Sequence, residues 1–278
     1  MTVIDCHHHF WTFGKRAHKF PPPVGTRLDH DYMPDHLRPQ LKAAGVDKTI
    51  LVQVLNEVDE THEFLQMSKD IDFVAGVVGW VPLADPPACA RALDDMKPRG
   101  KLVGIRPLIA YEPDPNWLVQ PSVRESLGLL AKAGLVFEAI PVNEQQFEAV
   151  LMVTRDIPGL KVVLNHLGNP PVPEKAWQPW AGNMARAAAL PNMSVKLSAG
   201  LALVVKWKWS TEEIRRYADY VLELFGPDRV MAGSNWPVVE LGGTYTQVWR
   251  GITDLIANLP AEDRAKVLGL SAQRIYGI

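Results

Sequence analysis

The sequence predicts one (β/α)8 TIM barrel of parallel strands, an α/β fold, as a single domain over residues 1–278. Three observations lead to this prediction. Short apolar runs alternate with amphipathic segments along the whole chain, the runs lack the polar alternation of half-exposed strands, and no change of composition divides the chain. Unalternating runs are expected where both faces of a parallel sheet are covered, and α/β barrels often reach this length as one domain.

The apolar runs predict eight strands, and eight strand–helix repeats favour a closed barrel over an open sheet. No Gly-x-Gly-x-x-Gly follows the first run, which counts against a dinucleotide-binding domain. The predicted strands are Val3–Cys6, Thr49–Leu55, Val74–Trp80, Leu102–Leu108, Val136–Ile140, Lys161–Leu164, Ser194–Leu197 and Arg229–Ala232.

The amphipathic segments between these runs predict the helices. Gly45, Gly134 and Gly226 follow three of them and suit the left-handed position past a helix end. Ser210 with Glu213 three residues later is typical of a helix start. The predicted helices cover residues 34–44, 58–70, 86–97, 121–133, 143–156, 175–189, 210–225, 245–258 and 261–273.

Composition excludes several classes of function. The chain is 47% hydrophobic and 22% charged, as in ordinary soluble proteins, and its net charge of -2 gives no basic surface for nucleic acid. No stretch approaches the roughly 18 apolar residues of a membrane span, and the N-terminal segment lacks the features of a signal peptide. Cys6 and Cys89 are expected to be buried thiols, as in a reducing cytoplasm. We therefore expect a cytoplasmic protein that acts on a small molecule, with homo-oligomer formation left open.

The first run leads into three consecutive histidines. Alternate residues of a strand share a face, so His7 and His9 are expected to point one way and His8 the other. At the C-terminal end of a barrel strand, the shared face lines the mouth where barrel enzymes carry out chemistry. Two imidazoles there can ligate one metal ion, or act together as an acid and a hydrogen-bond donor.

Other polar residues end or interrupt the predicted strands. His166 follows the sixth run and is a candidate catalytic residue, while Asn235, after the last run, can orient water but cannot act as a general base. Arg106 closes the fourth run, where it could grip a carbonyl or carboxylate or form a salt bridge at the rim. Lys196 is expected to point into the barrel, where a buried ammonium needs a partner or a shifted pKa. Gln53, in the second run, is a further candidate for substrate binding.

The predicted C-terminal loops carry aromatic and basic residues that point to two kinds of substrate. The rings of Trp11, Trp80 and Trp236 are candidates for stacking on a ring-shaped substrate, although packing between loops is the commoner use. Residues 15–19 make the first loop locally basic, which would suit an acidic substrate. The aromatic residues favour a sugar-derived compound.

Several segments together resemble the metal-dependent hydrolases of the amidohydrolase-related family, in the branch with sugar and dicarboxylate lactonases. They are IDCHHHFW, GIR, VVLNHLGNP, VKLS and VMAGSNWPV, and the resemblance covers essentially the whole chain. It implies a barrel in which His7, His9, His166 and position 235 meet at one point. The three histidines are then candidate ligands of a divalent metal, with zinc as the expected ion. The family usually has an aspartate that activates water where this chain has Asn235.

This asparagine leaves the metal requirement and the general base open. It is interpreted as a natural variant, against an engineered inactivation or a loss of catalysis. In a metal-dependent mechanism, zinc would polarise the carbonyl of a lactone. In a metal-independent one, His166 is the base, Arg106 steadies the oxyanion and Lys196 is the reserve candidate. The expected reaction is hydrolysis of an aldonolactone from sugar catabolism; the alternatives are decarboxylation of an aromatic acid and small-molecule binding without catalysis.

Overall fold

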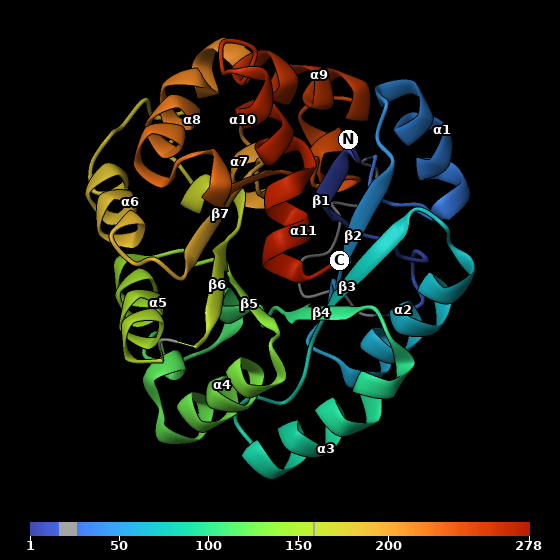
Figure 1. Ribbon diagram of the computed structural model, residues 1–278, viewed down its shortest axis with the longest axis vertical. Helices are drawn as coiled ribbons and strands as arrows, with labels where there is room; N and C mark the ends of the chain where they lie inside the picture. Colours follow the sequence, from blue (N-terminus) through green and yellow to red (C-terminus); the bar gives the residue numbers. More distant parts are fainter. Residues whose placement is uncertain (17–26, 158) are drawn as a thin grey trace.

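The computed structural model describes residues 1–16, 27–157 and 159–278, and it confirms the predicted (β/α)8 barrel. The strands form one parallel sheet in chain order, surrounded by a ring of helices (Figure 1). The strands are β1 (Ile4–His8), β2 (Lys48–Val52), β3 (Val74–Gly79), β4 (Leu102–Ile105), β5 (Val136–Ala139), β6 (Lys161–Leu164), β7 (Met193–Leu197) and β8 (Val230–Ala232).

The helices follow the predicted segments with three main differences. The sixth begins only at Trp180, and the predicted terminal helix is divided by a π-helical turn at Lys266–Leu270. A short helix, α7, was not predicted. The helices are α1 (Pro34–Ala44), α2 (Val58–Asp70), α3 (Pro86–Met96), α4 (Pro121–Ala133), α5 (Glu144–Asp156), α6 (Trp180–Ala188), α7 (Leu201–Val204), α8 (Thr211–Phe225), α9 (Tyr245–Leu255), α10 (Ala261–Ala265) and α11 (Ser271–Tyr276).

The predicted helix ends hold with one exception. Gly45 and Gly134 adopt the left-handed conformation after α1 and α4, and the Ser210 hydroxyl accepts a hydrogen bond from the Glu213 N–H at the start of α8. Gly226 has φ 69° but ψ 163°, so it leaves α8 with a positive φ outside the left-handed helical region.

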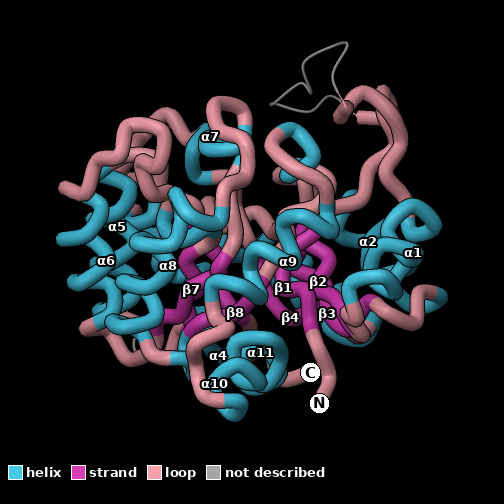
Figure 2. The backbone as a smooth tube through the Cα atoms, turned by 90° about the horizontal axis from the view of Figure 1, so that it is seen from above, coloured by secondary structure: helices cyan, strands magenta, loops and turns pink. Residues whose placement is uncertain are grey.

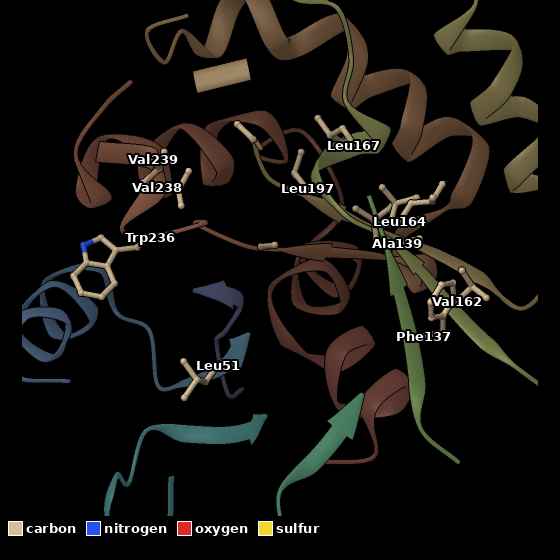
Figure 3. Packing of buried hydrophobic residues seen from close by; sticks show 14 of the residues in the cluster. Leu51, Phe137, Ala139, Val162, Leu164, Leu167, Leu197, Trp236, Val238 and Val239 are labelled. Carbon is tan, nitrogen blue, oxygen red and sulfur yellow. The ribbon is translucent and has the colours of Figure 1, made fainter. Parts of the chain in front are cut away.

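Buried apolar side chains pack on both sides of the barrel wall. Outward-facing residues such as Phe137 and Leu164 pack against the helices (Figure 3), while Val136 and Val163 belong to a separate inner cluster. This alternation along each strand is the period-two arrangement of a barrel, and both sides being apolar explains the unalternating sequence.

Helix α11 covers the end of the barrel at which the strands begin. Its Ala272, Ile275 and Tyr276 join the inner cluster, and both chain termini lie at this end, opposite α7 (Figure 2). The active-site mouth of a barrel lies at the other end, so α11 closes the floor. No described helix combines the length and the apolar character needed to cross a membrane.

The barrel closes between β1 and the segment after β8. The Asn235 N–H donates to the His7 carbonyl oxygen over 2.8 Å, and the His9 N–H donates to the Trp236 carbonyl oxygen over 2.8 Å. The Ser234 hydroxyl adds a bond of 2.6 Å to the Asp5 carboxylate. These bonds bring Asn235 beside the histidines of the first strand, although they are more than two hundred residues apart in the chain.

Candidate active site

The mouth of the barrel brings together polar side chains from the C-terminal ends of several strands. His9, Arg106, His166 and Asn235 line one cavity of about 160 Å³, and His7 lies beneath them, with its ring centroid 4.6 Å from that of His166. All five side chains are buried. The structure therefore places the predicted histidines and Asn235 at one site.

The two alternate histidines of β1 face each other as predicted. The Nε2 atoms of His7 and His9 are 3.2 Å apart, whereas His8 points the other way and pairs with the Thr49 hydroxyl at 2.8 Å. The Nδ1 atom of His9 lies 2.8 Å from the Val52 carbonyl oxygen, to which it must donate. The Nε2 atom of His9 is therefore the acceptor of its neutral ring.

Beneath His7, a buried ion pair occupies the barrel interior. The Lys196 ammonium lies 2.7 Å from each Glu138 carboxylate oxygen, and the Tyr276 hydroxyl of α11 donates to the same carboxylate over 2.5 Å. Burial lowers the pKa of Lys196, and the charge of Glu138 opposes that shift. The third contact of the ammonium is the Nδ1 atom of His7 at 3.3 Å, so its three donors face three acceptors.

These neighbours determine the hydrogen-bonding roles of His7. An ammonium can only donate, so Nδ1 of His7 accepts and Nε2 carries the proton. That Nε2–H can then donate to Nε2 of His9, which completes a chain from Lys196 through both rings to the Val52 carbonyl. Asn165 also lies 3.2 Å from Nδ1 of His7, through its Oδ1 atom, and its buried Nδ2 has no partner among the described residues. Turned round, the amide would point this Nδ2 donor at Nδ1 of His7, in agreement with Nδ1 being an acceptor.

This arrangement does not fit a resident divalent metal. The 3.2 Å separation of the two Nε2 atoms would suit a shared zinc ion, but only if both atoms presented lone pairs. The Lys196 contact at Nδ1 of His7 leaves the ring proton on Nε2, which then has no lone pair for a metal, and the Arg106 Nη1 atom lies 3.5 Å from that Nε2. Among the residues that the structure describes, there is no group of three or more His, Cys, Asp or Glu side chains that could hold a metal ion. The three histidines predicted as metal ligands, His7, His9 and His166, therefore lie together, but their ring nitrogens are placed for hydrogen bonding.

His166 lies in a strained turn after β6. Its φ is 55°, and a Cβ atom at Gly200 would come within 2.9 Å of its ring, so the glycine leaves the space that the imidazole needs. Its Nδ1 atom pairs with the Ser198 hydroxyl at 2.9 Å. Burial and the charges of Arg106 and Lys196 hold the pKa of His166 well below its ordinary value. The ring is consequently neutral at pH 7 and can accept a proton.

Asn235 is held by its donors and presents its acceptor. Its φ is 59°, a conformation that asparagine tolerates well, and its Nδ2 donates to the Ala199 carbonyl oxygen over 2.7 Å. The buried Oδ1 atom has no protein partner in the described part of the chain. An unpartnered buried acceptor at a cavity wall is suited to bind a water molecule or a substrate hydroxyl.

Changing Asn235 to aspartate is expected to weaken the site. A carboxylate would replace the N–H donor opposite the Ala199 carbonyl oxygen, so we expect a loss of about 1–3 kcal/mol in unfolding free energy and no gain in activity. Denaturant unfolding and lactone hydrolysis of Asn235→Asp test this, with the exposed Asn116→Asp as the matched control. A large gain in activity would show that the site requires a carboxylate.

Arg106 is fixed by Gln53 at the end of β4. One guanidinium nitrogen, Nη2, donates to the Gln53 carbonyl oxygen and, over 3.0 Å, to its side-chain Oε1, while the Gln53 Nε2 donates back to the Arg106 carbonyl oxygen over 2.5 Å. Burial lowers the pKa of Arg106 to about 10, so it stays charged at neutral pH. Gln53 is fully buried and does not line the cavity; its contacts identify it as a positioning residue for Arg106.

The turn after β2 is supported by a buried glutamate. The Glu60 carboxylate of α2 accepts hydrogen bonds of 2.8 Å from the N–H groups of Val54 and Leu55, directly after Gln53. Burial raises the pKa of Glu60 from 4.5 to about 7. The folded protein therefore keeps a proton that the unfolded chain loses between these pH values.

Stability should consequently fall as the pH rises from about 4.5 to 7, because the unfolded state binds fewer protons in that window. Glu60→Gln is expected to match the parent near pH 5 and to exceed it by up to about 3 kcal/mol near pH 8. Urea unfolding across this range measures the difference, with the exposed Glu125→Gln as the control. A constant difference between Glu60→Gln and the parent would contradict the assignment.

The tryptophans proposed for substrate stacking do not line the cavity. Trp11 packs on Tyr32, with ring centroids 5.3 Å apart, and Trp236 is fully buried in the apolar cluster of Figure 3, where it donates to Glu240. Trp80 is partly exposed but is also absent from the lining. The rings of Trp11 and Trp236 therefore serve in packing, which is the commoner use of tryptophan at such positions.

The basic first loop is largely neutralised where it is described. Lys15 lies 2.6 Å from Glu63, and Arg16 bridges Glu57 and Glu63. His18 and Lys19, which completed this basic segment in the sequence, lie outside the described residues. The described charges of this loop therefore give little support to an acidic substrate.

With the geometry established, comparison with known proteins places the chain in a family. The sequence model of the amidohydrolase family matches residues 4–278. The chain belongs to this family. It is 31% identical to an L-fucono-1,5-lactonase of Burkholderia ambifaria, over 99% of this chain and 95% of that protein. It is also 27% identical to an L-rhamnono-gamma-lactonase of Scheffersomyces stipitis, over 63% of this chain and 59% of that one.

A solved structure of an amidohydrolase from Burkholderia multivorans, crystallised with bound zinc, is similar over the full length of both chains. The TM-score is 0.89 and the sequence identity is 30%. A protein that is 30% identical to this chain therefore binds zinc in a crystal. In the chain described here, the contacts around His7 favour a metal-free arrangement.

Proposed function

We propose that this amidohydrolase opens a small, sugar-derived lactone by attack of water on the ester carbonyl. The observation that carries the proposal is that His166, Arg106 and Asn235 line one cavity in complementary states: a neutral imidazole, a fixed cation and a free amide oxygen. These are the parts that ester hydrolysis needs, namely a base, an oxyanion partner and a group that orients water. Similarity to sugar lactonases supports the same chemistry.

In the proposed reaction, Asn235 Oδ1 accepts one hydrogen of the attacking water, and the free Nε2 of His166 takes the other proton as the C–O bond forms. Arg106 stabilises the negative charge that develops on the carbonyl oxygen. The tetrahedral intermediate then breaks its bond to the ring oxygen, which receives the proton from His166. The product is the open-chain hydroxy acid, and His166 returns to its neutral form.

The Lys196–Glu138 pair contributes by orientation in this scheme. It fixes the His7 ring, and through it the His9 ring, so that the cavity floor keeps one hydrogen-bonding pattern. Burial holds the pKa values of His7 and His166 well below their ordinary value, and the charge of the ammonium beneath the site lowers them further. Burial and this charge together keep both imidazoles neutral.

Acid release from a panel of sugar lactones, followed with a pH indicator, tests the proposal directly. We expect turnover by metal-free protein, unchanged by a chelator, and its loss in His166→Gln. Turnover that requires added zinc would overturn the metal-free mechanism while keeping the lactonase. Carbon dioxide release from hydroxybenzoates without any lactone hydrolysis would overturn the proposed function.

A further inference from the structure

His166 opens a run of four consecutive residues with positive φ. The values are 55° for His166, 53° for Leu167, 65° for Gly168 and 56° for Asn169. Residues other than glycine visit the left-handed region mainly one at a time, because their Cβ then lies too close to the following carbonyl oxygen. Only one of these four residues is a glycine. The main chain that carries the proposed base is therefore held in a conformation that it would not adopt by itself.

The main chain of this left-handed turn leaves one carbonyl group to be paired from outside. Two main-chain hydrogen bonds of 3.0 and 2.9 Å close the turn, and their acceptors are the carbonyl oxygens of Asn165 and His166. The Leu167 carbonyl cannot be paired in the same way, because Pro170 and Pro171 have no N–H to donate. Leu167 is fully buried, with its side chain in the apolar cluster of Figure 3, so its carbonyl needs a donor from elsewhere in the fold.

The indole of Trp180, at the start of α6, supplies that donor. Its Nε1–H donates to the Leu167 carbonyl oxygen over 2.8 Å. The same helix packs closely against the turn, since a Cβ atom at Gly168 would come within 2.7 Å of the Met184 Sδ atom. Trp180 is buried and does not line the cavity, so it acts on the site only through the turn.

We infer that Trp180 is a positioning residue for His166: its N–H keeps the left-handed turn formed, and the turn aims the imidazole at the cavity. The inference rests on the proposed function, because it takes His166 as the base, and it adds a residue outside the cavity to the reaction. Without the N–H, the buried Leu167 carbonyl loses its partner, and an unfavourable turn relaxes toward conformations that pair this carbonyl with water. The His166 ring then loses its fixed direction.

Two neighbouring tryptophans provide matched variants. Trp180→Phe removes the N–H and keeps an aromatic ring, and we expect kcat for lactone hydrolysis to fall about ten- to a hundredfold, as for a reacting group displaced by about 1 Å. KM should change little, because Trp180 does not touch the substrate. Trp177 packs on Trp180, Tyr217 and Tyr220, but it is the Trp180 N–H that reaches the turn. Trp177→Phe makes the same chemical change in the same aromatic group and should leave kcat unchanged, even if it lowers stability.

The Cε1–H resonance of His166 reports on the ring without catalysis. In protein labelled with ¹³C-histidine, the resonance is identified by its absence from His166→Gln. We expect it to shift or broaden in Trp180→Phe and to keep its position in Trp177→Phe. If Trp180→Phe does not fold, incorporation of 3-benzothienylalanine at position 180 replaces the N–H by sulfur while keeping both rings, and the same two changes are expected.

The outcomes separate the inference from the proposed function. Parent-like kcat, or an unmoved His166 resonance, in Trp180→Phe would overturn the inference and keep the lactonase. Equal losses of kcat in Trp180→Phe and Trp177→Phe would indicate a packing defect and would also overturn it. A moved resonance in a protein that hydrolyses no lactone would support the control of His166 by Trp180 and refute the proposed function. An unmoved resonance with no lactone hydrolysed would refute both.

Discussion

Replacing Glu138 by glutamine is expected to lower the free energy of unfolding by about 3–5 kcal/mol. Glu138 and Lys196 are both fully buried, and glutamine keeps the shape of the side chain but removes the charge that compensates the ammonium. Loss of one partner of a buried pair costs this much because the other charge is left without compensation. Denaturant unfolding at pH 7 measures the effect.

A double variant distinguishes loss of charge compensation from loss of packing. Glu138→Gln with Lys196→Met removes both charges, so it should recover most of the stability that the single change loses. The deficit of Glu138→Gln should also shrink as the pH rises toward 10.5, the ordinary pKa of lysine. The depressed pKa of Lys196 lets the folded protein release its proton before the unfolded chain does, so stability rises with pH. A deficit that does not vary with pH and persists in the double variant would indicate a packing defect.

The C-terminal helix contributes to the same network. Tyr276 donates to Glu138 from a helix that closes the barrel floor, which links the last turn of the chain to the residues beneath His7. Loss of a single hydrogen bond to a carboxylate costs less than loss of the carboxylate itself. Tyr276→Phe should therefore destabilise the protein by less than Glu138→Gln does.

The convergence of the site could be predicted because it follows from strand geometry. Residues two apart on a strand share a face, which gave the His7–His9 pair, and parallel strands in a barrel end at the same rim, which brought His166 and Asn235 to it. Arg106 and Lys196 were found by the same reasoning. Lys196 was expected to need a partner or a shifted pKa if buried, and it has both: an ion pair with Glu138 and a lowered pKa caused by burial.

Glu138, the partner of Lys196, was not predicted, although the sequence contains an indication of it. Glu138 is a charged residue within the apolar run of β5, as Lys196 is within β7, and two opposite charges inside neighbouring regions of one barrel could have been paired. Tyr276 gave no such signal, because it is 138 residues from Glu138 in the chain and ends an ordinary amphipathic helix. Its contact depends on how α11 packs across the floor.

The tryptophans show where sequence reasoning reaches its limit. Position in a C-terminal loop places a ring near the mouth, but loop conformation decides whether the ring faces the cavity or a neighbouring loop. Trp236 turns into the core and donates to Glu240, whereas the aliphatic residues Ile109 and Leu201, which drew no attention in the sequence, line the cavity. The lining of the cavity therefore includes residues whose place only the folded chain reveals.

Replacing Arg106 by alanine is expected to lower kcat for lactone hydrolysis by about 10²–10³-fold, the cost of removing one strong oxyanion donor. The guanidinium is the buried cation that lines the cavity beside His166, and Gln53 holds it in a fixed orientation. Because the interaction develops in the transition state, the loss should fall mainly on kcat, with KM changing little.

Arg106→Lys shows whether charge or geometry matters. Lysine keeps a positive charge but cannot contact the Gln53 carbonyl and Oε1 while also presenting a second nitrogen to the substrate, so it should recover only a small part of the rate. Added guanidinium ions should partly restore the activity of Arg106→Ala. They would not do so if the variant had lost activity through unfolding. Arg99→Met, at an exposed arginine paired with Asp95, is the matched control and should leave kcat unchanged. Full activity in Arg106→Ala would remove Arg106 from the mechanism and leave the oxyanion without a protein partner.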